Sequence, residues 1–361
     1  PIREFVDAVR RAVERGDLEG GDVGGIGRVV EDTQEAGGRM AASAPDDAEL
    51  AEFAETAGKG QIRQTEELRA SILEEARREG FQPDVALRED LQRTIDAGAG
   101  EGEIIAHPAV VDAIRRMDGI VPTNKRPGYL NDDWLENRVF NIDGEEVVGY
   151  EAGVAKMYDL AMSQVPQGVA QSREVVFVLG PPASGKSMIA EQIRDSRRAM
   201  IIDSDDYKKT LPEFEGGMGS NATHAESKYV MAEIIKRAVE ENRSIVIPTV
   251  GHVADLTADL ISQFKGMGYR VTLMHMRVPY EEAFRRMIAR FIRDGRLIAP
   301  GYMREVGDNT RKTYYDLKAK GLADSHGEVD NSAPLGAPRE ILDDPDGIVS
   351  LWGIGGHRSG R

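Results

Sequence analysis

VVFVLGPPASGKS, residues 175–187, decides the fold of this chain. Val175–Leu179 is a short apolar, β-branched run, as expected for a buried strand of a parallel sheet. It is followed directly by Gly180-Pro181-Pro182-Ala183-Ser184-Gly185-Lys186-Ser187, which fits the pattern G-x-x-x-x-G-K-[ST] without a gap. A helical pattern begins at Ser187, so the motif lies between a strand and a helix, where a phosphate-binding loop requires it.

The loop predicts a site for ATP and Mg²⁺. Its glycines allow backbone N–H groups to surround a phosphate, and the N-terminus of the following helix adds partial positive charge. We expect Lys186 to reach the β- and γ-phosphates and Ser187 to bind Mg²⁺. The competing interpretation is a Gly/Pro turn with an incidental lysine.

Outward from this loop, apolar strands alternate with helical stretches. This order predicts an α/β fold, a parallel sheet with helices on both faces, as in P-loop kinases, preceded by a mostly α-helical N-terminal region. The expected strands are 175–179, 200–202, 245–247 and 271–276, and the expected helices are 187–197, 224–241, 254–265 and 280–293.

Acidic residues follow the second expected strand, in the order Asp203-Ser204-Asp205-Asp206. The carboxyl ends of parallel strands open onto the ligand crevice, so these carboxylates should face the phosphate loop. One could hold Mg²⁺, and another could accept a proton from an attacking hydroxyl group. A solvated acidic turn that caps the next helix is the alternative.

Arginines recur on one face of the helix expected over 280–293. Arg286, Arg290 and Arg293 are spaced at i, i+4 and i+7, and Arg296 follows. Guanidinium groups match phosphate oxygens and would stabilise a transferring phosphoryl group. A surface arginine stripe without a ligand is the competing interpretation.

Over about 174–330 the sequence resembles the zeta-toxin family of P-loop kinases. The resemblance is carried by GPPASGKS (180–187), IIDSDDYK (201–208), SIVIPTVGHVADL (244–256) and GYRVTLMHMRVP (268–279), together with the arginine-bearing helix. It implies transfer of the γ-phosphate of ATP to the 3′-hydroxyl of the amino sugar in UDP-N-acetylglucosamine, by a bacterial or phage-borne toxin or effector. Some relatives instead act on the adenosine ribose of NAD.

The resemblance also implies roles for individual residues. The catalytic base falls on Asp205, with Asp203 as the first acid of the D-x-D-x-[FY]-K pattern and a metal-site candidate beside Ser187. The phosphate-binding lysine is Lys186, and the two phosphate-clamping arginines fall on Arg290 and Arg296.

Two departures from the family pattern concern the acceptor. Pro248 and Val250 replace an acid and a threonine, and a substrate-contacting glutamate aligns with Ala232, beside Glu233. The candidate substrate residues are Asp206, Glu233, His252 and Arg293. The resemblance therefore supports a kinase more firmly than one acceptor. A kinase of another nucleotide such as NAD, and a catalytically weak nucleotide-binding interaction module, remain the alternatives.

The charge of the chain is unevenly distributed. Its 361 residues carry a formal net charge of -16, and a chain this acidic is a poor general nucleic-acid binder. Residues 1–172 hold 35 acids and 19 bases, a net of -16, so the 27 acids and 27 bases of 173–361 balance. Cysteine is absent, which excludes disulfides and cysteine zinc sites.

No apolar run approaches the ~20 residues of a membrane span, and the sequence leads us to expect no signal peptide. We therefore expect no membrane partner and a cytoplasmic protein, or one delivered into the cytoplasm of a target cell. The sequence begins with Pro1 rather than Met, which leaves open whether upstream sequence is missing.

Four segments are expected: an acidic, mostly helical region with Gly-rich linkers (1–118), a hairpin and helix (119–171), the kinase domain (172–335) and a C-terminal tail (336–361). The first segment could be a cis-acting inhibitor that covers the kinase site, a module for an antitoxin, chaperone or other partner, or a helical extension packed on the kinase. We favour a helical interaction module.

Overall fold

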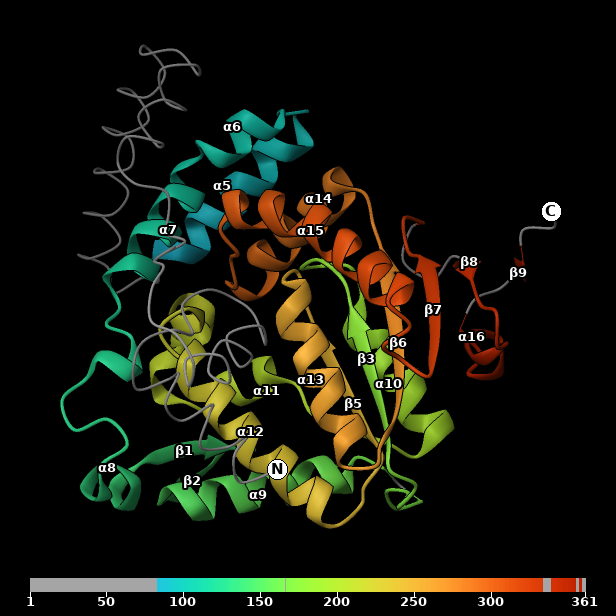
Figure 1. The fold of residues 1–361 in the computed structure, drawn as a ribbon. Coiled ribbons are helices and arrows are strands. Elements are labelled where there is room, and N and C mark those ends of the chain that lie inside the picture. Colours follow the sequence, from blue (N-terminus) through green and yellow to red (C-terminus); the bar gives the residue numbers. More distant parts are fainter. Residues whose placement is uncertain (1–82, 166, 334–338, 355–356, 359–361) are drawn as a thin grey trace, which may run out of the picture.

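A computed structural model describes residues 83–165, 167–333, 339–354 and 357–358. Its main feature is a seven-stranded sheet with the strand order β4-β5-β3-β6-β7-β8-β9 (Figure 1). The first five strands in this order are mutually parallel, β8 is antiparallel to β7, and β9 is parallel to β8. The strands are Glu174–Leu179 (β3), Met200–Ile201 (β4), Ile245–Thr249 (β5), Arg270–Arg277 (β6), Ser325–Asp330 (β7), Glu340–Asp343 (β8) and His357–Arg358 (β9).

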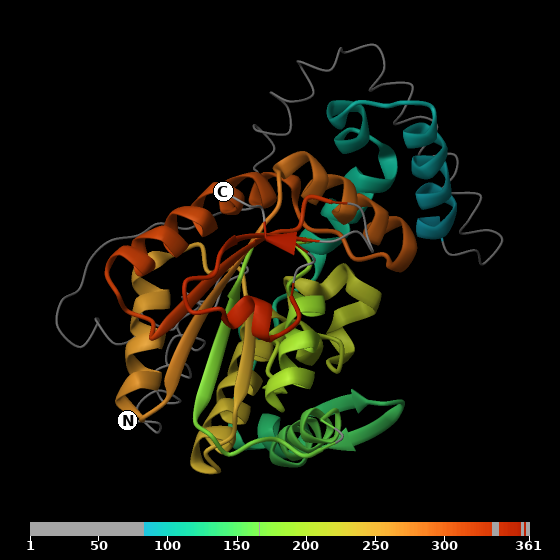
Figure 2. The same cartoon turned by 90° about the vertical axis from the view of Figure 1, so that its right-hand side faces the viewer.

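Both faces of this sheet are covered, as Figure 2 shows in a second view. Alternate residues of β3 point to opposite faces, so Val175 and Phe177 enter one core while Val176 and Val178 enter the other. The first core also takes side chains from α9 (Tyr150–Ser163), α12 (His224–Glu240), α13 (Ala254–Gly266) and α15 (Pro300–Ala319). The second takes them from α10 (Lys186–Arg197) and α16 (Ile348–Leu351). This double burial explains why β3 is a continuous apolar run, and it confirms the predicted fold class.

Eight helices follow β3 in the described part of the chain, and the four that were expected (α10, α12, α13 and α14) lie close to their expected ranges. The eight are Lys186–Arg197 (α10), Ser204–Lys208 (α11), Pro212–Ser220 (η3, a 3-10 helix), His224–Glu240 (α12), Ala254–Gly266 (α13), Tyr280–Asp294 (α14), Pro300–Ala319 (α15) and Ile348–Leu351 (α16). The helices α11, η3, α15 and α16 and the strands β7, β8 and β9 were not predicted. The sequence of β7, SHGEVD, is polar, but Glu328 is buried there because it accepts hydrogen bonds from His275 and Tyr315.

The segment before β3 contains the predicted hairpin. Val139–Ile142 (β1) pairs antiparallel with Glu145–Val148 (β2), and Asp143 and Gly144 form the turn, both with positive φ. The helix Tyr150–Ser163 (α9) then leads to β3 at the end of the sheet opposite the phosphate loop (Figure 1). Before the hairpin lie Thr123–Lys125 (η2, a 3-10 helix) and Asp132–Asn137 (α8).

Three helices begin the described chain: Pro83–Asp96 (α5), Glu101–Ile105 (α6) and Pro108–Gly119 (α7). Helices α5 and α7 pack against α14 in a third core, separate from the two cores of the sheet. Figures 1 and 2 both place these helices beside α14, at the end of the sheet where β3 reaches the loop. The core includes Leu87, Leu91, Val110, Ile114, Met117, Phe284, Met287 and Phe291.

Residues 1–82 lie outside the described residues, and with them most of the acidic, mostly helical region expected over 1–118. The proposed inhibitory, partner-binding or packing role of the region 1–118 stays a prediction, although α5 and α7 contact α14. No helix among the described residues combines the length and apolarity of a membrane-crossing segment.

Candidate active site

The predicted phosphate loop lies at the point where the strand order of the sheet reverses. Strand β3 has β5 on one side and β6 on the other, so the connections after it diverge and leave a crevice at its carboxyl end. Gly180 and Gly185 are required by close packing. A Cβ atom on Gly180 would lie 2.5 Å from Ser184 Oγ, and one on Gly185 would lie 2.4 Å from Asn331 Nδ2. Gly185 also has φ of 90°, in the left-handed region that favours glycine.

Lys186 is held by the loop itself. Its ammonium donates hydrogen bonds to the carbonyl oxygens of Gly180 at 2.7 Å and Pro181 at 2.8 Å. Burial lowers the pKa of Lys186 to about 8, despite the opposing effect of the nearby carboxylates. Asn331, which follows β7, donates a hydrogen bond to the Ser184 carbonyl oxygen at 2.8 Å and so helps to fix the conformation of the loop. Nothing in the sequence indicated this contact.

The two predicted carboxylates occupy different environments at the start of α11. Asp203 accepts a hydrogen bond from the Asp205 backbone N–H at 2.9 Å and so caps the helix. Burial raises its pKa to about 7, with further contributions from the charges of Asp205 and Asp206. Asp205 is only partly buried, and Lys208 at 3.1 Å and Arg296 at 2.5 Å hold its pKa well below the ordinary value. Asp205 is therefore ionised at neutral pH.

Arg296 reaches Asp205 because the chain turns sharply after α14. Gly295 ends the helix with φ of 77°, and the next residue enters the crevice. The backbone at Arg296 packs closely on η3, where a Cβ atom on Gly217 would lie 2.9 Å from Arg296 Cα. Arg286, the first residue of the predicted stripe, instead bonds Glu282 and the carbonyl oxygens of Asn331 and Ala333.

These groups surround one cavity of about 960 Å³. It brings together most of the predicted site residues: Pro182, Ala183, Ser184, Gly185, Lys186, Ser187, Asp203, Asp205, His252, Arg290, Arg293 and Arg296. Two predicted substrate residues are not among those that line it. Asp206 is exposed and pairs with Lys209, and Glu233 pairs with Lys236 on α12.

Several residues that line the cavity were not predicted from the sequence. Lys208, His224 and Lys228 are buried on α11 and α12. Lys208 ends the D-x-D-x-[FY]-K pattern, which was a usable signal, whereas the other two lie in an ordinary amphipathic helix. Neither ring nitrogen of His224 has a hydrogen-bond partner within the described part of the chain, and burial holds its pKa well below the ordinary value.

Ser187 and Asp203 both face the cavity and suit Mg²⁺. This ion commonly takes only one or two protein oxygens and completes its shell with water and substrate phosphates. Within the described ranges, no group of three or more histidine and acidic side chains could hold a metal without such help. The donor set therefore fits a metal that is bound together with a nucleotide.

The charge of Asp203 predicts a pH-dependent stability. Unfolded, this carboxyl ionises near pH 4, whereas in the folded protein it ionises near pH 7, so folding loses stability as the pH rises between these values. Asp203→Asn removes this loss and keeps an oxygen to cap α11. We expect the variant to be more stable by on the order of 2 kcal/mol at pH 8, after discounting for water in the cavity, and by less than half of that at pH 5, where most of the loss has not yet occurred.

Denaturant unfolding at both pH values, without Mg²⁺, measures this difference. Asp206→Asn on the same short helix is the matched control and should have little effect at either pH. An equal stability change for Asp203→Asn at pH 5 and pH 8 would contradict the assigned ionisation.

Comparisons with known proteins gave one family match and several similarities to solved structures. No curated protein shows significant similarity to the chain. Among solved structures, it is similar to a chain from the PezAT chromosomal toxin–antitoxin system of Streptococcus pneumoniae, with 14% identity and a TM-score of 0.42 over 54% of this chain and 81% of that one. It is also similar to a chain of the AvrRxo1-ORF1:-ORF2 complex with ATP, with 16% identity and a TM-score of 0.42 over 53% and 65% of the two chains.

The family profile named Zeta toxin matches residues 162–352, which span β3 to α16 and include the loop, both carboxylates and the arginines of the cavity. This match covers more than half of the chain. The chain therefore belongs to the Zeta toxin family.

Proposed function

We propose that this protein is a kinase that transfers the γ-phosphate of ATP to a hydroxyl group of a small acceptor. The observation that carries the proposal is that one cavity contains the phosphate loop with Lys186, the ionised Asp205, and Arg290 and Arg296. Phosphoryl transfer needs these groups: a cradle for the phosphates, an acceptor of the hydroxyl proton, and cations around the transferring group.

In the proposed reaction, the acceptor oxygen bonds to the γ-phosphorus while the bond from that phosphorus to the β-phosphate oxygen breaks. Asp205 orients the hydroxyl and takes its proton, and ADP leaves. A carboxylate with a low pKa is adequate because the transition state of phosphoryl transfer is loose and the proton moves late. Arg296 already pairs with Asp205, so in this proposal its guanidinium group lies between the base and the transferring phosphoryl group.

Lys186, Arg290 and Arg296 supply positive charge to the transferring group. Mg²⁺, held by Ser187 and Asp203 when bound, would neutralise phosphate charge and orient the triphosphate. Because these donors are fixed before the reaction by the loop, α11 and α14, little reorganisation is needed during transfer.

The acceptor side of the cavity supports a nucleotide-like, anionic substrate. Lys208 and Lys228 are buried there, and His224 offers two ring nitrogens. The hydroxyl of Thr249, at the end of β5, is buried and has no hydrogen-bond partner among the described residues, so it could bind a substrate hydroxyl. These groups favour UDP-N-acetylglucosamine, as the family resemblance implies, although Pro248 and Val250 depart from its pattern.

NAD is the second candidate, since its adenosine ribose also combines a hydroxyl with nearby phosphates. The test is incubation of the full chain with ATP and Mg²⁺ and either UDP-N-acetylglucosamine, NAD or no acceptor, followed by mass analysis. Phosphorylated UDP-N-acetylglucosamine supports the first candidate, and phosphorylated NAD alone supports the second. If neither gains a phosphate and ADP forms at the same rate without them, the nucleotide-binding interaction module is the better reading.

A further inference from the structure

One segment before the family domain forms part of the cavity wall. We call residues 108–126 the strap; it comprises α7, the connection after it and η2. Ile114, Met117, Ile120, Pro122 and Asn124 of the strap all line the cavity that holds Lys186 and Asp205. The family match begins only at residue 162, so the matched domain does not include this wall.

The first end of the strap is fixed to the arginine-bearing helix. Ile114 and Met117 are buried in the core shared with α14. From α5 in the same core, Arg88 donates hydrogen bonds to the carbonyl oxygens of Phe291 at 3.3 Å and Ile292 at 3.2 Å. These bonds occupy the last turn of α14, between Arg290 and Arg296, so the N-terminal helices and the two phosphate-clamping arginines form one packed unit.

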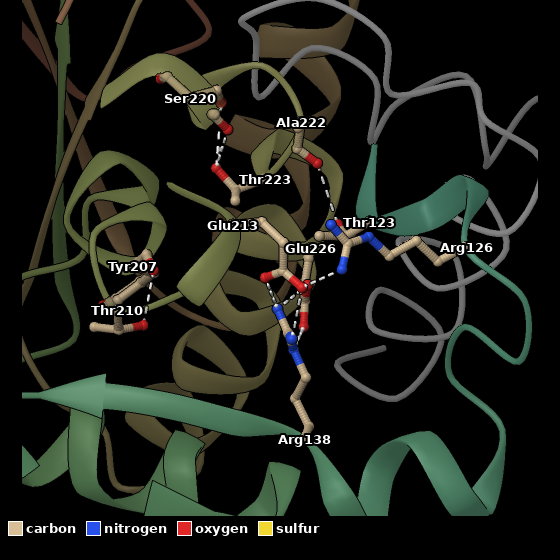
Figure 3. Close-up of polar contacts among 11 residues, drawn as sticks. Thr123, Arg126, Arg138, Tyr207, Thr210, Glu213, Ser220, Ala222, Thr223 and Glu226 are labelled. Carbon is tan, nitrogen blue, oxygen red and sulfur yellow. Dashed lines mark hydrogen bonds and ion pairs between the residues drawn. The ribbon is translucent and has the colours of Figure 1, made fainter. Parts of the chain in front are cut away.

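The second end of the strap is fixed to the opposite wall (Figure 3). The backbone N–H and the hydroxyl of Thr123 both donate to the Ala222 carbonyl oxygen, at 2.9 Å and 3.2 Å. Arg126 donates to Glu213 on η3 at 2.7 Å. Ala222 lies two residues before α12, which packs against α11, the helix that carries Asp205. The strap thus ends on the side of the cavity where the proposed base lies.

Buried ion pairs hold this second attachment. Arg138 bonds Glu213 at 2.6 Å and Glu226 at 2.6 Å, and all three side chains are at least nine-tenths buried (Figure 3). Burial alone would lower the pKa of Arg138, but the two carboxylates raise it. Removing one member of such a network leaves a buried charge without its partner, so the network keeps η3 and α12 in one position. The strap is therefore bound at both ends to rigid elements.

The strap also differs chemically from the rest of the cavity. Helices α11, α12 and α14 contribute mainly polar or charged groups and the loop contributes Lys186, whereas the strap contributes four apolar side chains and one amide. A phosphate has no partner on such a surface. An uncharged ring does find partners on this surface. The face of the ring can pack on Ile120 and Met117, and the Asn124 amide can donate and accept hydrogen bonds at the edge of the ring.

From this placement we propose that the strap is the specificity wall of the acceptor site, where Ile120 and Asn124 contact the uncharged ring portion of the acceptor. The N-terminal helices would then be a working part of the kinase site and not a cover that inhibits it. This inference rests on the proposed kinase function and adds to it the residues that determine the specificity for the acceptor.

The test compares three single variants of the full chain: Ile120→Ala, Asn124→Ala and, as matched control, Arg115→Ala, whose side chain is exposed on α7. For Ile120→Ala and Asn124→Ala we expect KM for the acceptor to rise about 10-fold, with KM for ATP and the melting temperature nearly unchanged. The control should match the wild type in all three quantities. The acceptor is whichever of UDP-N-acetylglucosamine and NAD the wild type phosphorylates.

Other outcomes overturn the inference in distinguishable ways. If the wild type phosphorylates an acceptor and neither variant changes its KM, the strap is not the acceptor wall, while the kinase function stands. If either variant raises kcat/KM, the strap is an inhibitory cover. If KM for ATP rises and that for the acceptor does not, the strap contacts the nucleotide instead. A wild type that phosphorylates neither compound, and whose melting temperature neither compound raises, overturns both proposals.

Discussion

Asp205→Asn is expected to lower kcat by about 10³-fold, with little change in KM for ATP. Asparagine has nearly the shape of aspartate but cannot take the proton of the acceptor hydroxyl, and general-base groups typically contribute 10²–10⁴-fold to the rate. The substitution also removes the negative charge that Arg296 and Lys208 contact, so the hydroxyl loses its orientation as well. Steady-state kinetics with the identified acceptor measures the effect.

Asp206→Asn is the control for this experiment. Asp206 lies next to Asp205 on the same helix, but it is exposed, pairs with Lys209 and is not among the residues that line the cavity. Its rate should stay within about two-fold of the wild type, as expected for a weak surface ion pair. Equal rates for the two variants would show that Asp205 is not the base.

Lys186→Ala should lower kcat/KM for ATP by about 10³-fold, because a preorganised cation at the transferring phosphate is removed from a water-poor site. The lysine also predicts a pH effect. Burial gives it a pKa of about 8, so it carries its charge below pH 8 and loses it above. In the wild type, KM for ATP should therefore rise as the pH increases above about 8, whereas in Lys186→Ala it should stay flat.

Lys236→Ala provides the matched control, since Lys236 lies on α12, pairs with Glu233 and is not a cavity residue. It should show wild-type kinetics and the wild-type pH profile. Retention of more than a tenth of kcat/KM by Lys186→Ala would mean that the loop binds no phosphate in the proposed manner.

The sequence predicted the centre of the sheet well because β3, β5 and β6 are buried on both faces. Such strands must be apolar along their whole length, and this signal needs no knowledge of the neighbours. Strand β7 escaped prediction for the opposite reason. Its buried Glu328 is tolerated only because His275 and Tyr315 bond it, and those partners are distant in the sequence.

The same distinction between local signals and tertiary packing decides which residues of the candidate site could be predicted. Lys186, Asp203 and Asp205 lie in local motifs whose order along the chain fixes their place at the sheet edge. His224 and Lys228 enter the cavity only because α12 packs beside α11, and Ile120 and Asn124 because the strap crosses from α14 to η3. No periodicity marks such residues, since the tertiary structure alone brings them to the site.

The central claim is that this cavity transfers phosphate from ATP to an acceptor hydroxyl. The most direct test is to measure ADP and phosphorylated acceptor together, in one reaction of the full chain with ATP, Mg²⁺ and UDP-N-acetylglucosamine or NAD. We predict that the two products form in equal amounts and that both disappear in Asp205→Asn. ADP formed without phosphorylated acceptor, or at an equal rate in Asp205→Asn, would contradict the claim.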